Sequence, residues 1–209
     1  MQNAAFDVRG LDWSYLACDI EAERLEAAVL GLDALGFAGA NVTAPYKLDV
    51  ARLVETDLES VNTLLFDPPR GFSTDAAILG GLGFERAAII GDGGAATAFR
   101  HALPDARLFS RRTDWPPQVG SADLVVNATP VQDEVLAELG RGQTLIDLPY
   151  PDSATATAAR RAGARVLGGL EVLVAQGAAS FELWTGVPAP VELMRRAVGL
   201  HRAEPEHSR

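Results

Sequence analysis

The chain has 209 residues, of which 48% are hydrophobic, so it can form one large or two small domains around a substantial core. Its formal net charge of −10 argues against a general nucleic-acid binder or a binder of anionic membranes. Cys18 is the one cysteine, so no intrachain disulfide can form, which fits a cytoplasmic protein. The sequence shows no signal peptide and no apolar run of the roughly 18 residues that a transmembrane helix needs.

Short strands and helices alternate in the first third of the chain. The apolar spacing between residues 21 and 36 predicts an amphipathic helix that ends at Gly36. Pro45 disfavours a helical conformation at Ala44, so a turn is expected there. The predicted strands are residues 15–20 and 61–66, and residues 39–45 are expected to be a strand end that runs into a turn. The predicted helices are residues 21–36 and 47–55, with a turn or hairpin loop at residues 67–71.

The middle third alternates in a more regular way. Apolar runs alternate with turn residues and with two helical segments, which predicts a parallel sheet covered by helices on both faces. The strands are expected within residues 86–90, 106–112, 122–130, 144–151 and 165–169, and the helices within residues 94–103 and 155–164. Residues 171–200 predict two further helices separated by residues 185–190, and residues 201–209 a polar, frayed tail.

A glycine turn joins the first of these strands to its helix. Residues 91–96 have the form G-x-G-x-x-A directly after an apolar strand, which is the context a dinucleotide-binding turn requires. Gly91 permits the tight turn, Gly93 lets the backbone approach a pyrophosphate, and Ala96 allows close packing of helix on strand. Gly94 and Ala95 open the helix, whose free N–H groups favour an anion. An ordinary strand–turn–helix connection is the alternative, and the carboxylate of Asp92 is unfavourable in such a loop unless it points away.

The end of the next strand indicates which nucleotide is bound. An NAD site would place Asp or Glu about 20 residues after the first glycine. This chain instead has Ser110, Arg111, Arg112 and Thr113 there, and guanidinium groups suit a 2′-phosphate. We therefore predict NADP rather than NAD, and no metal site; the alternative is that both arginines are ordinary surface charges.

Several polar residues outside this turn have two possible explanations. Lys47 is either a solvated lysine after a surface turn or a cation directed into a cleft. Asp75 could be a helix N-cap, because it precedes an apolar helical segment. Asn62, Tyr150 and Gln176 could likewise be a turn-facing strand residue, a packed turn aromatic and a solvated helix residue.

The order of the motifs resembles the shikimate dehydrogenases, including the related quinate/shikimate dehydrogenases, over nearly the whole chain. The longest motif, at residues 168–186, is similar to the family's C-terminal signature. The motifs that carry the resemblance are NAAF, GANVTAPYK, SVNTLLF, STDA, GDGGAA, SRRT, VVNATP, IDLPY and GGLEVLVAQGAASFELWTG.

The resemblance implies reduction of 3-dehydroshikimate to shikimate with NADPH, a step of aromatic amino acid biosynthesis. It implies an α/β fold: a Rossmann-type parallel sheet at 81–170, a smaller α/β substrate domain at 1–80, and C-terminal helices at 171–209 that return to the substrate domain. A monomer or homodimer is expected. By motif match the catalytic residues are Lys47 and Asp75, the substrate-binding residues are Thr43, Asn62, Tyr150 and Gln176, and further cofactor-binding residues are Asn127, Thr129 and Gly169.

The resemblance also breaks in places. The family commonly begins with a further strand and an S-x-S-P loop whose serines hold the substrate carboxylate, whereas this sequence begins at MQNAAF. One expectation is a natural protein with further residues upstream, and the other is a short form with an exposed sheet edge. Ser73, Ala76 and Val172 replace the usual Asn, Gly and Met. Competing hypotheses are therefore a relative acting on quinate, an aminoshikimate or another hydroxy acid, and a nucleotide-binding protein without turnover.

Overall fold

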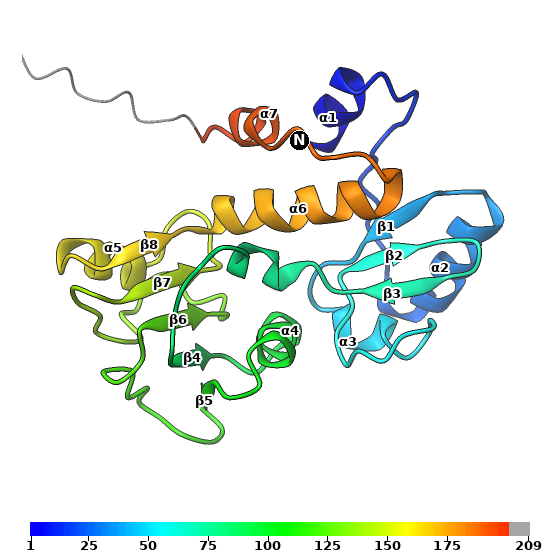
Figure 1. The fold of residues 1–209 in the computed structure, drawn as a ribbon. Helices are drawn as coiled ribbons and strands as arrows, with labels where there is room; N and C mark the ends of the chain where they lie inside the picture. The colour runs from blue at the N-terminus through cyan, green and yellow to red at the C-terminus, as the bar shows by residue number, and fades with distance from the viewer. Residues whose placement is uncertain (201–209) are drawn as a thin grey trace, which may run out of the picture.

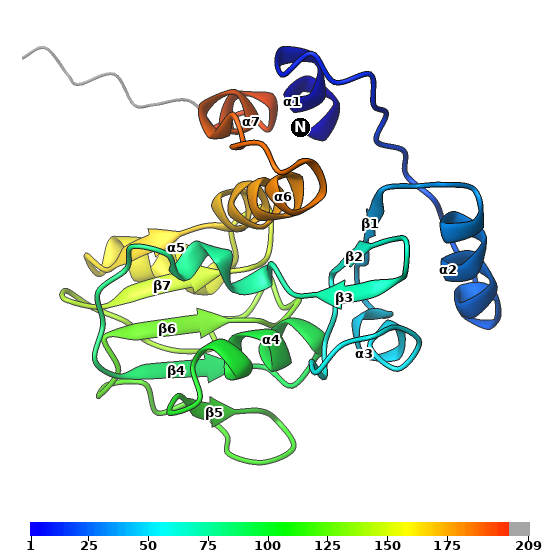
Figure 2. The same ribbon diagram turned by 45° about the vertical axis from the view of Figure 1, so that its right-hand side comes forward.

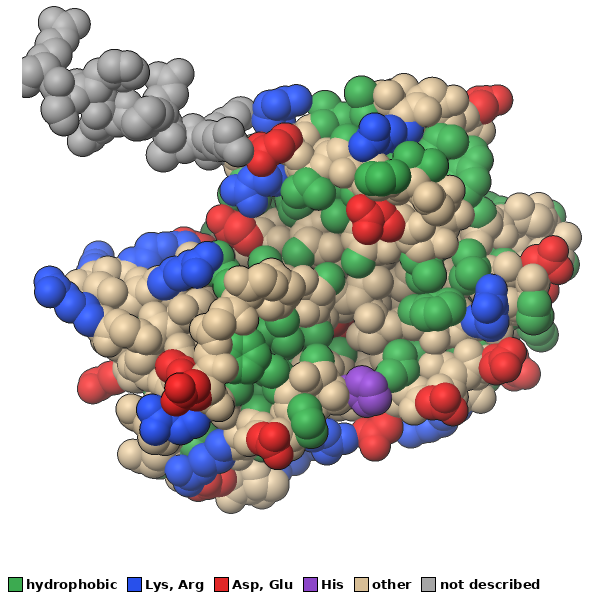
Figure 3. Space-filling view, in the orientation of Figure 1, with side chains coloured by type: hydrophobic (Ala, Val, Ile, Leu, Met, Phe, Trp, Pro, Cys, Tyr) green, Lys and Arg blue, Asp and Glu red, His purple; other side chains and the backbone are tan. Residues whose placement is uncertain are grey.

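The computed structural model describes residues 1–200, and the polar tail expected at residues 201–209 lies outside the described residues. Two β-sheets lie side by side, and the long helix α6 (Gly169–Thr185) runs across both (Figure 1). No helix of the described part combines the length and hydropathy that crossing a bilayer requires. On the face shown in Figure 3, acidic and basic side chains are interspersed.

The larger sheet has five parallel strands, as the alternating pattern predicts, and the structure gives their order as β5-β4-β6-β7-β8. Alternate residues of each strand point to opposite faces, so Ile90 and Val125 pack beneath α5 while Ile89 and Val126 pack beneath α4 and α6. The elements are β4 (Ala87–Ile90), α4 (Gly94–Ala102), β5 (Arg107–Phe109), β6 (Leu124–Asn127), β7 (Thr144–Asp147), α5 (Ala154–Arg161) and β8 (Arg165–Leu167).

The smaller sheet is antiparallel, with the order β1-β2-β3. Leu25, Val29 and Leu32 of the predicted amphipathic helix pack onto its core, and Gly36 ends that helix with a φ of +75°. The elements are η1 (Ala22–Arg24), α2 (Leu25–Ala34), β1 (Gly39–Asn41), α3 (Lys47–Val50), β2 (Thr63–Leu65), β3 (Arg70–Phe72) and the 3₁₀ helix η2 (Asp75–Leu79).

Two expectations for this half of the molecule are wrong. Residues 15–20 form no strand, and the helix expected at residues 47–55 ends at Val50. A strand needs a partner for its backbone groups, but β1 pairs only with β2. The side-chain amide of Asn3 instead bonds both backbone groups of Tyr15: its Oδ1 accepts from Tyr15 N at 2.6 Å and its Nδ2 donates to Tyr15 O at 3.1 Å.

A separate small hydrophobic core brings together the two ends of the described chain. Phe6 of α1 (Gln2–Val8) stacks on Phe181 of α6, and Met194 of α7 (Val191–Ala197) completes the cluster. Figure 2 shows α1 and α7 together on the side of α6 that faces away from the sheets. Trp184 Nε1 donates to Leu64 O at 2.9 Å, which ties α6 to strand β2. The prediction of two C-terminal helices is confirmed.

Candidate active site

Lys47 and Asp75 form an ion pair between the two sheets. Lys47 Nζ lies 2.7 Å from both carboxylate oxygens of Asp75, and the two side chains are 14% and 6% exposed. Lys47 opens α3 directly after the turn at Pro45, and Asp75 opens η2. Lys47 is therefore not a solvated surface lysine. Asp75 is not an N-cap either, because Thr74 occupies that position and no side chain caps η2.

Asn62 connects this ion pair to helix α6. Its Nδ2 donates to Asp75 Oδ1 at 2.9 Å and to Gln176 Oε1 at 3.0 Å, and its Oδ1 accepts from Thr74 N at 2.7 Å. Asn62 is 2% exposed and ends the segment that leads into β2. The structure thus brings together four of the predicted site residues: Lys47, Asn62, Asp75 and Gln176.

A second layer of polar residues, not predicted from the sequence, supports Asn62. Ser180 Oγ lies 2.9 Å from Thr63 Oγ1 and 3.1 Å from Thr74 Oγ1, and it accepts from Asn41 Nδ2 at 3.0 Å. Ser180 is fully buried. The sequence signal for it is the four-residue spacing from Gln176, which places both side chains on one face of α6.

The composition of the chain also draws attention to Lys47. It is the only lysine in the 209 residues, and the other 17 residues of the Lys+Arg total are arginines. A guanidinium stays protonated at all accessible pH values, whereas an ammonium can give up a proton. The single lysine lies at the one buried ion pair of the described residues in which both side chains are less than one-sixth exposed.

Thr43 and Tyr150 are not joined to this cluster by any hydrogen bond within residues 1–200. Thr43 is exposed in the turn before Lys47, and its carbonyl accepts from Tyr46 N at 3.1 Å. Tyr150 follows β7 and is 58% exposed. The structure thus leaves the predicted substrate contacts of Thr43 and Tyr150 untested.

The glycine turn between β4 and α4 fits a pyrophosphate. Gly91 has a φ of +130°, and a Cβ there would lie 3.0 Å from Ala128 O, so the turn requires glycine. A Cβ at Gly93 would meet nothing within 4 Å, which leaves the backbone open to a ligand at the N-terminus of α4. Ala95 follows in the first turn, and Ala96 is 2% exposed against the sheet.

The arginine segment lies beside this turn, because Gly91 N donates to Phe109 O of β5 at 2.8 Å. Ser110 Oγ and Thr113 Oγ1 lie 3.1 Å apart, which closes the loop after the strand. Arg112 Nε lies 3.5 Å from Asp92 Oδ2, so the Asp92 carboxylate is directed outward to this arginine. Arg111 is exposed, pairs with Glu134 and lies over the Trp115 ring at 5.1 Å. Both guanidinium groups are thus exposed beside the glycine turn, and each has a carboxylate partner.

The remaining predicted cofactor residues have internal partners. Asn127 is fully buried, donates to Asp147 Oδ1 at 2.7 Å and accepts from Thr129 Oγ1 at 2.8 Å. A Cβ at Gly169 would lie 2.5 Å from Leu148 O, so glycine lets α6 start against the chain that follows β7. These contacts order the edge of the sheet at which the parallel strands end. Contacts of Asn127, Thr129 and Gly169 with NADP stay a prediction.

Comparison with known proteins gives consistent results across the chain. The family described as the shikimate dehydrogenase substrate binding domain matches residues 1–64, and the shikimate 5′-dehydrogenase C-terminal domain matches residues 169–198. A shikimate dehydrogenase (NADP(+)) of Anaeromyxobacter sp. (strain Fw109-5) is 39% identical, with 95% of this chain and 89% of that protein covered. The chain belongs to the shikimate dehydrogenase family.

Solved structures of the family have the same fold. Shikimate dehydrogenase from Aquifex aeolicus gives a TM-score of 0.85 at 27% identity over 95% of this chain and 91% of that chain. The enzyme from Thermus thermophilus, solved in complex with NADP(H) and shikimate, gives 0.81 at 26% identity over 94% and 91%. This confirms the predicted α/β fold with a Rossmann-type parallel sheet, beside which lies a smaller antiparallel sheet.

The family match also shows that this chain is shorter than its relative. The alignment with the Anaeromyxobacter shikimate dehydrogenase spans 249 positions, whereas this chain has 209 residues, so the relative has segments without a counterpart here. The matched ranges include Thr43, Lys47 and Asn62 at one end and Gly169 and Gln176 at the other. Lys47, Asn62 and Gln176 thus all lie in segments that match the family.

Proposed function

We propose that this protein is an NADP-dependent shikimate dehydrogenase that reduces 3-dehydroshikimate to shikimate. The observation that carries the proposal is the pair of the single lysine, Lys47, and the buried Asp75, 2.7 Å apart and tied by Asn62 to Gln176 of α6. Shikimate dehydrogenase (NADP(+)) relatives that are 34–39% identical support it, as does the Thermus thermophilus structure with NADP(H) and shikimate.

Reduction of the substrate ketone adds a hydride to the carbonyl carbon and a proton to the carbonyl oxygen. NADPH, when bound, supplies the hydride to the carbonyl carbon of the substrate. Lys47 stabilises the negative charge that develops on the carbonyl oxygen and donates the proton that completes the hydroxyl. Asp75 holds the ammonium in place through both carboxylate oxygens and can accept a hydrogen bond from a neighbouring substrate hydroxyl.

The polyol substrate would be oriented by amide and hydroxyl groups. Asn62 and Gln176 present side chains from the small sheet and from α6, so a substrate between them would contact both halves of the molecule. Thr43 would add a hydroxyl from the turn before Lys47. Tyr150 would lie near the substrate carboxylate. The residues of this substrate set therefore come from four segments that are distant in sequence.

The cofactor would lie along the glycine turn and the arginine segment. The N–H groups at the start of α4 would hold the pyrophosphate, and Arg111 and Arg112 the 2′-phosphate. On this assignment residues 1–80 serve as the substrate domain, residues 81–170 bind NADP and the C-terminal helices from residue 171 close on the substrate domain. We further propose a cytoplasmic monomer or homodimer, in keeping with one exposed free cysteine.

The test is nicotinamide absorbance with shikimate plus NADP⁺, with quinate and NAD⁺ in parallel. We expect a shikimate-dependent rise that is larger with NADP⁺, and no rise with the Lys47→Ala variant although it still binds NADPH. Preference for quinate would support the alternative hydroxy-acid hypothesis. Nucleotide binding with no oxidation of either acid would favour a protein without turnover, and an unchanged rate in Lys47→Ala would contradict the role of the lysine.

A further inference from the structure

The start of helix α4 is in direct contact with Lys47. A Cβ atom at Gly94 would lie 2.9 Å from Lys47 Cβ and 3.2 Å from Ser60 Oγ, so no side chain fits at this position without displacing a neighbour. Lys47 Cβ is attached to the backbone of α3, so it cannot move aside as the end of a long side chain could. Gly94 thus belongs to the contact between the nucleotide turn and the segment that carries Lys47.

The same contact is fastened by hydrogen bonds that lead back to Lys47. Ser60 Oγ donates to Gly94 O at 2.8 Å, and Ser60 is 2% exposed. The next residue, Val61, donates its N–H to Lys47 O at 2.9 Å. A continuous path of three residues therefore links the first residue of α4 to the backbone of Lys47.

We infer that Gly94 and Ser60 are positioning residues, which fix the distance between the nucleotide turn and the Lys47 ammonium. The inference rests on the proposed function, because the distance matters only if a hydride arriving from a bound nucleotide and a proton from Lys47 meet on one carbonyl group. It gives Gly94 a role different from that of Gly93, although both belong to the same glycine-rich turn. Gly93 leaves space for the ligand, whereas Gly94 leaves space for the other half of the protein.

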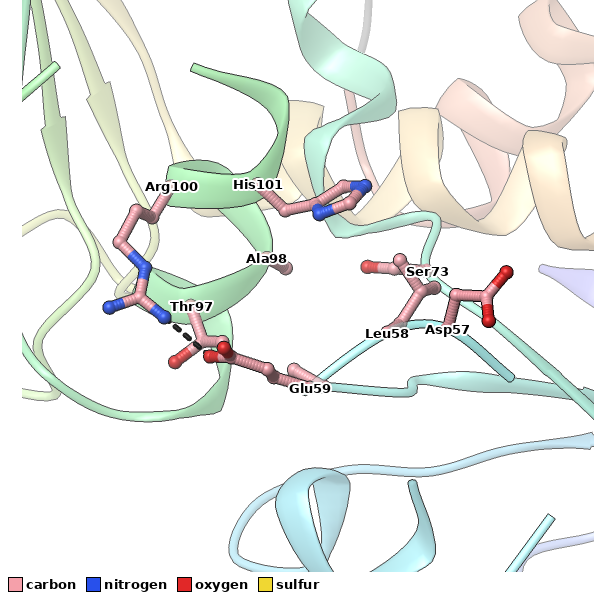
Figure 4. A pocket seen from close by; sticks show the side chains of 9 residues that line it. Asp57, Leu58, Glu59, Ser73, Thr97, Ala98, Arg100 and His101 are labelled. Carbon is pink, nitrogen blue, oxygen red and sulfur yellow. Dashed lines mark hydrogen bonds and ion pairs between the residues drawn. The ribbon is translucent and has the colours of Figure 1, made fainter. Parts of the chain in front are cut away.

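A nearby ion pair bridges the same two halves but is exposed to solvent. Figure 4 shows Arg100 of α4 directed toward Glu59, beside a pocket between α4 and residues 57–60. Exposed ion pairs contribute little to stability. We therefore assign the positioning to the buried contact of Gly94 and Ser60, and the Arg100–Glu59 pair serves as a control.

The experiment compares Gly94→Ala with Gly93→Ala in the full-length chain. In Gly94→Ala we expect kcat at saturating NADPH and substrate to fall by about tenfold or more, since a displacement of ~1 Å can cost a factor of about 100, with the NADPH Kd within about threefold of wild type. Gly93→Ala should show the reverse pattern, a raised NADPH Kd with a smaller change in kcat. Ser60→Ala should lower kcat as Gly94→Ala does, and Glu59→Gln should leave both constants within about twofold.

A second measurement reports on Lys47 without turnover. Because the chain has one lysine, acetylation by acetic anhydride followed by peptide mapping separates Lys47 from the N-terminal amine. Without nucleotide, Gly94→Ala should change the labelling rate of Lys47 by about threefold or more relative to Gly93→Ala, because Lys47 is displaced from Asp75 and the reactivity of a lysine amine depends on its surroundings. Thermal melting shows that each variant is folded.

The outcomes separate the inference from the proposed function. If wild type oxidises no hydroxy acid, the proposed function is wrong, while the labelling rates still test the contact. If Gly94→Ala raises the NADPH Kd and keeps a wild-type kcat, or if its Lys47 labels at the wild-type rate, the positioning role is overturned.

Discussion

The two halves of the candidate site differ in how completely the protein satisfies their polar groups. Around Asn62, five side chains and a backbone N–H form a buried network, and Asn62, Asp75 and Ser180 are all less than 5% exposed. The nucleotide side has exposed arginines, an open glycine turn and a loosely paired Asp92. The Asn62 side is therefore ordered by buried hydrogen bonds within the protein, whereas the glycine-turn side has its charged groups at the surface, in ion pairs that are open to solvent.

This difference separates the expected consequences of mutation. A buried polar network loses stability and geometry together when one member is removed, because its partners are left without hydrogen bonds. Removal of an exposed cation lowers the affinity of the protein for its ligand and changes the stability little. The predictions below use this contrast, from the largest expected effect to the smallest.

Lys47→Arg gives the largest effect. Arginine keeps the positive charge next to Asp75 but cannot donate its proton as an acid, so kcat should fall by about 10²–10⁴-fold, the usual contribution of general acid catalysis. Binding of NADPH, measured by fluorescence titration, should change little. Retention of more than about a tenth of the wild-type kcat would mean that charge alone suffices and that the proton comes from elsewhere.

Asn62→Ala should affect both stability and substrate use. The change removes the donor to Asp75 and Gln176 and the acceptor for Thr74 N, which should lower the free energy of unfolding by about 1–3 kcal/mol and raise the KM for shikimate. Urea unfolding and initial rates measure the two effects. Ser153→Ala is the matched control: Ser153 is fully buried and caps α5, so its loss should lower stability by about 1 kcal/mol and leave the KM for shikimate unchanged.

Arg112→Ala should act on the nucleotide alone. The loss of a charged hydrogen-bond donor should raise the KM for NADPH by about tenfold, which corresponds to about 1.4 kcal/mol, and leave the KM for NADH unchanged. Arg107→Ala is the control, because Arg107 is also an exposed arginine paired with an aspartate, Asp114, at the same strand. An equal loss of NADPH and NADH use in Arg112→Ala would argue against a contact with the 2′-phosphate.

Asp123 gives the smallest effect, one that depends on pH. Its carboxylate accepts from Glu85 N at 2.9 Å and from Arg86 N at 2.7 Å, and these backbone hydrogen bonds lower its pKa. A lowered folded-state pKa adds stability above the unfolded-state pKa of about 3.9, and this contribution is lost as pH falls through the folded-state value. Wild type should therefore exceed Asp123→Asn in stability at neutral pH, and the difference should shrink in acid. Urea unfolding at several pH values measures it; a difference independent of pH would contradict this cause.

Local pattern was sufficient for the five-stranded sheet. Its strands lie in segments bounded by turn residues and alternate with two helical segments, so the parallel sheet is predicted from neighbours in sequence, although the order of its strands is not. The glycine turn, the arginine segment and the choice of NADP also follow from residues that are close together in the chain. Lys47, as the only lysine, is marked by composition.

The hydrogen-bond network of the candidate site and the small sheet depend on contacts between distant segments. Asn62 and Gln176 are 114 residues apart and meet only because α6 crosses both sheets. Residues 15–20 have the composition of a strand but lack a partner, so Asn3 takes up the backbone groups of Tyr15 instead. Gly94 has the sequence context of a nucleotide turn, yet its missing Cβ makes room for Lys47. Hydrogen-bond partners and close approaches of this kind are decided by packing, because no local preference specifies which distant atom occupies the adjoining space.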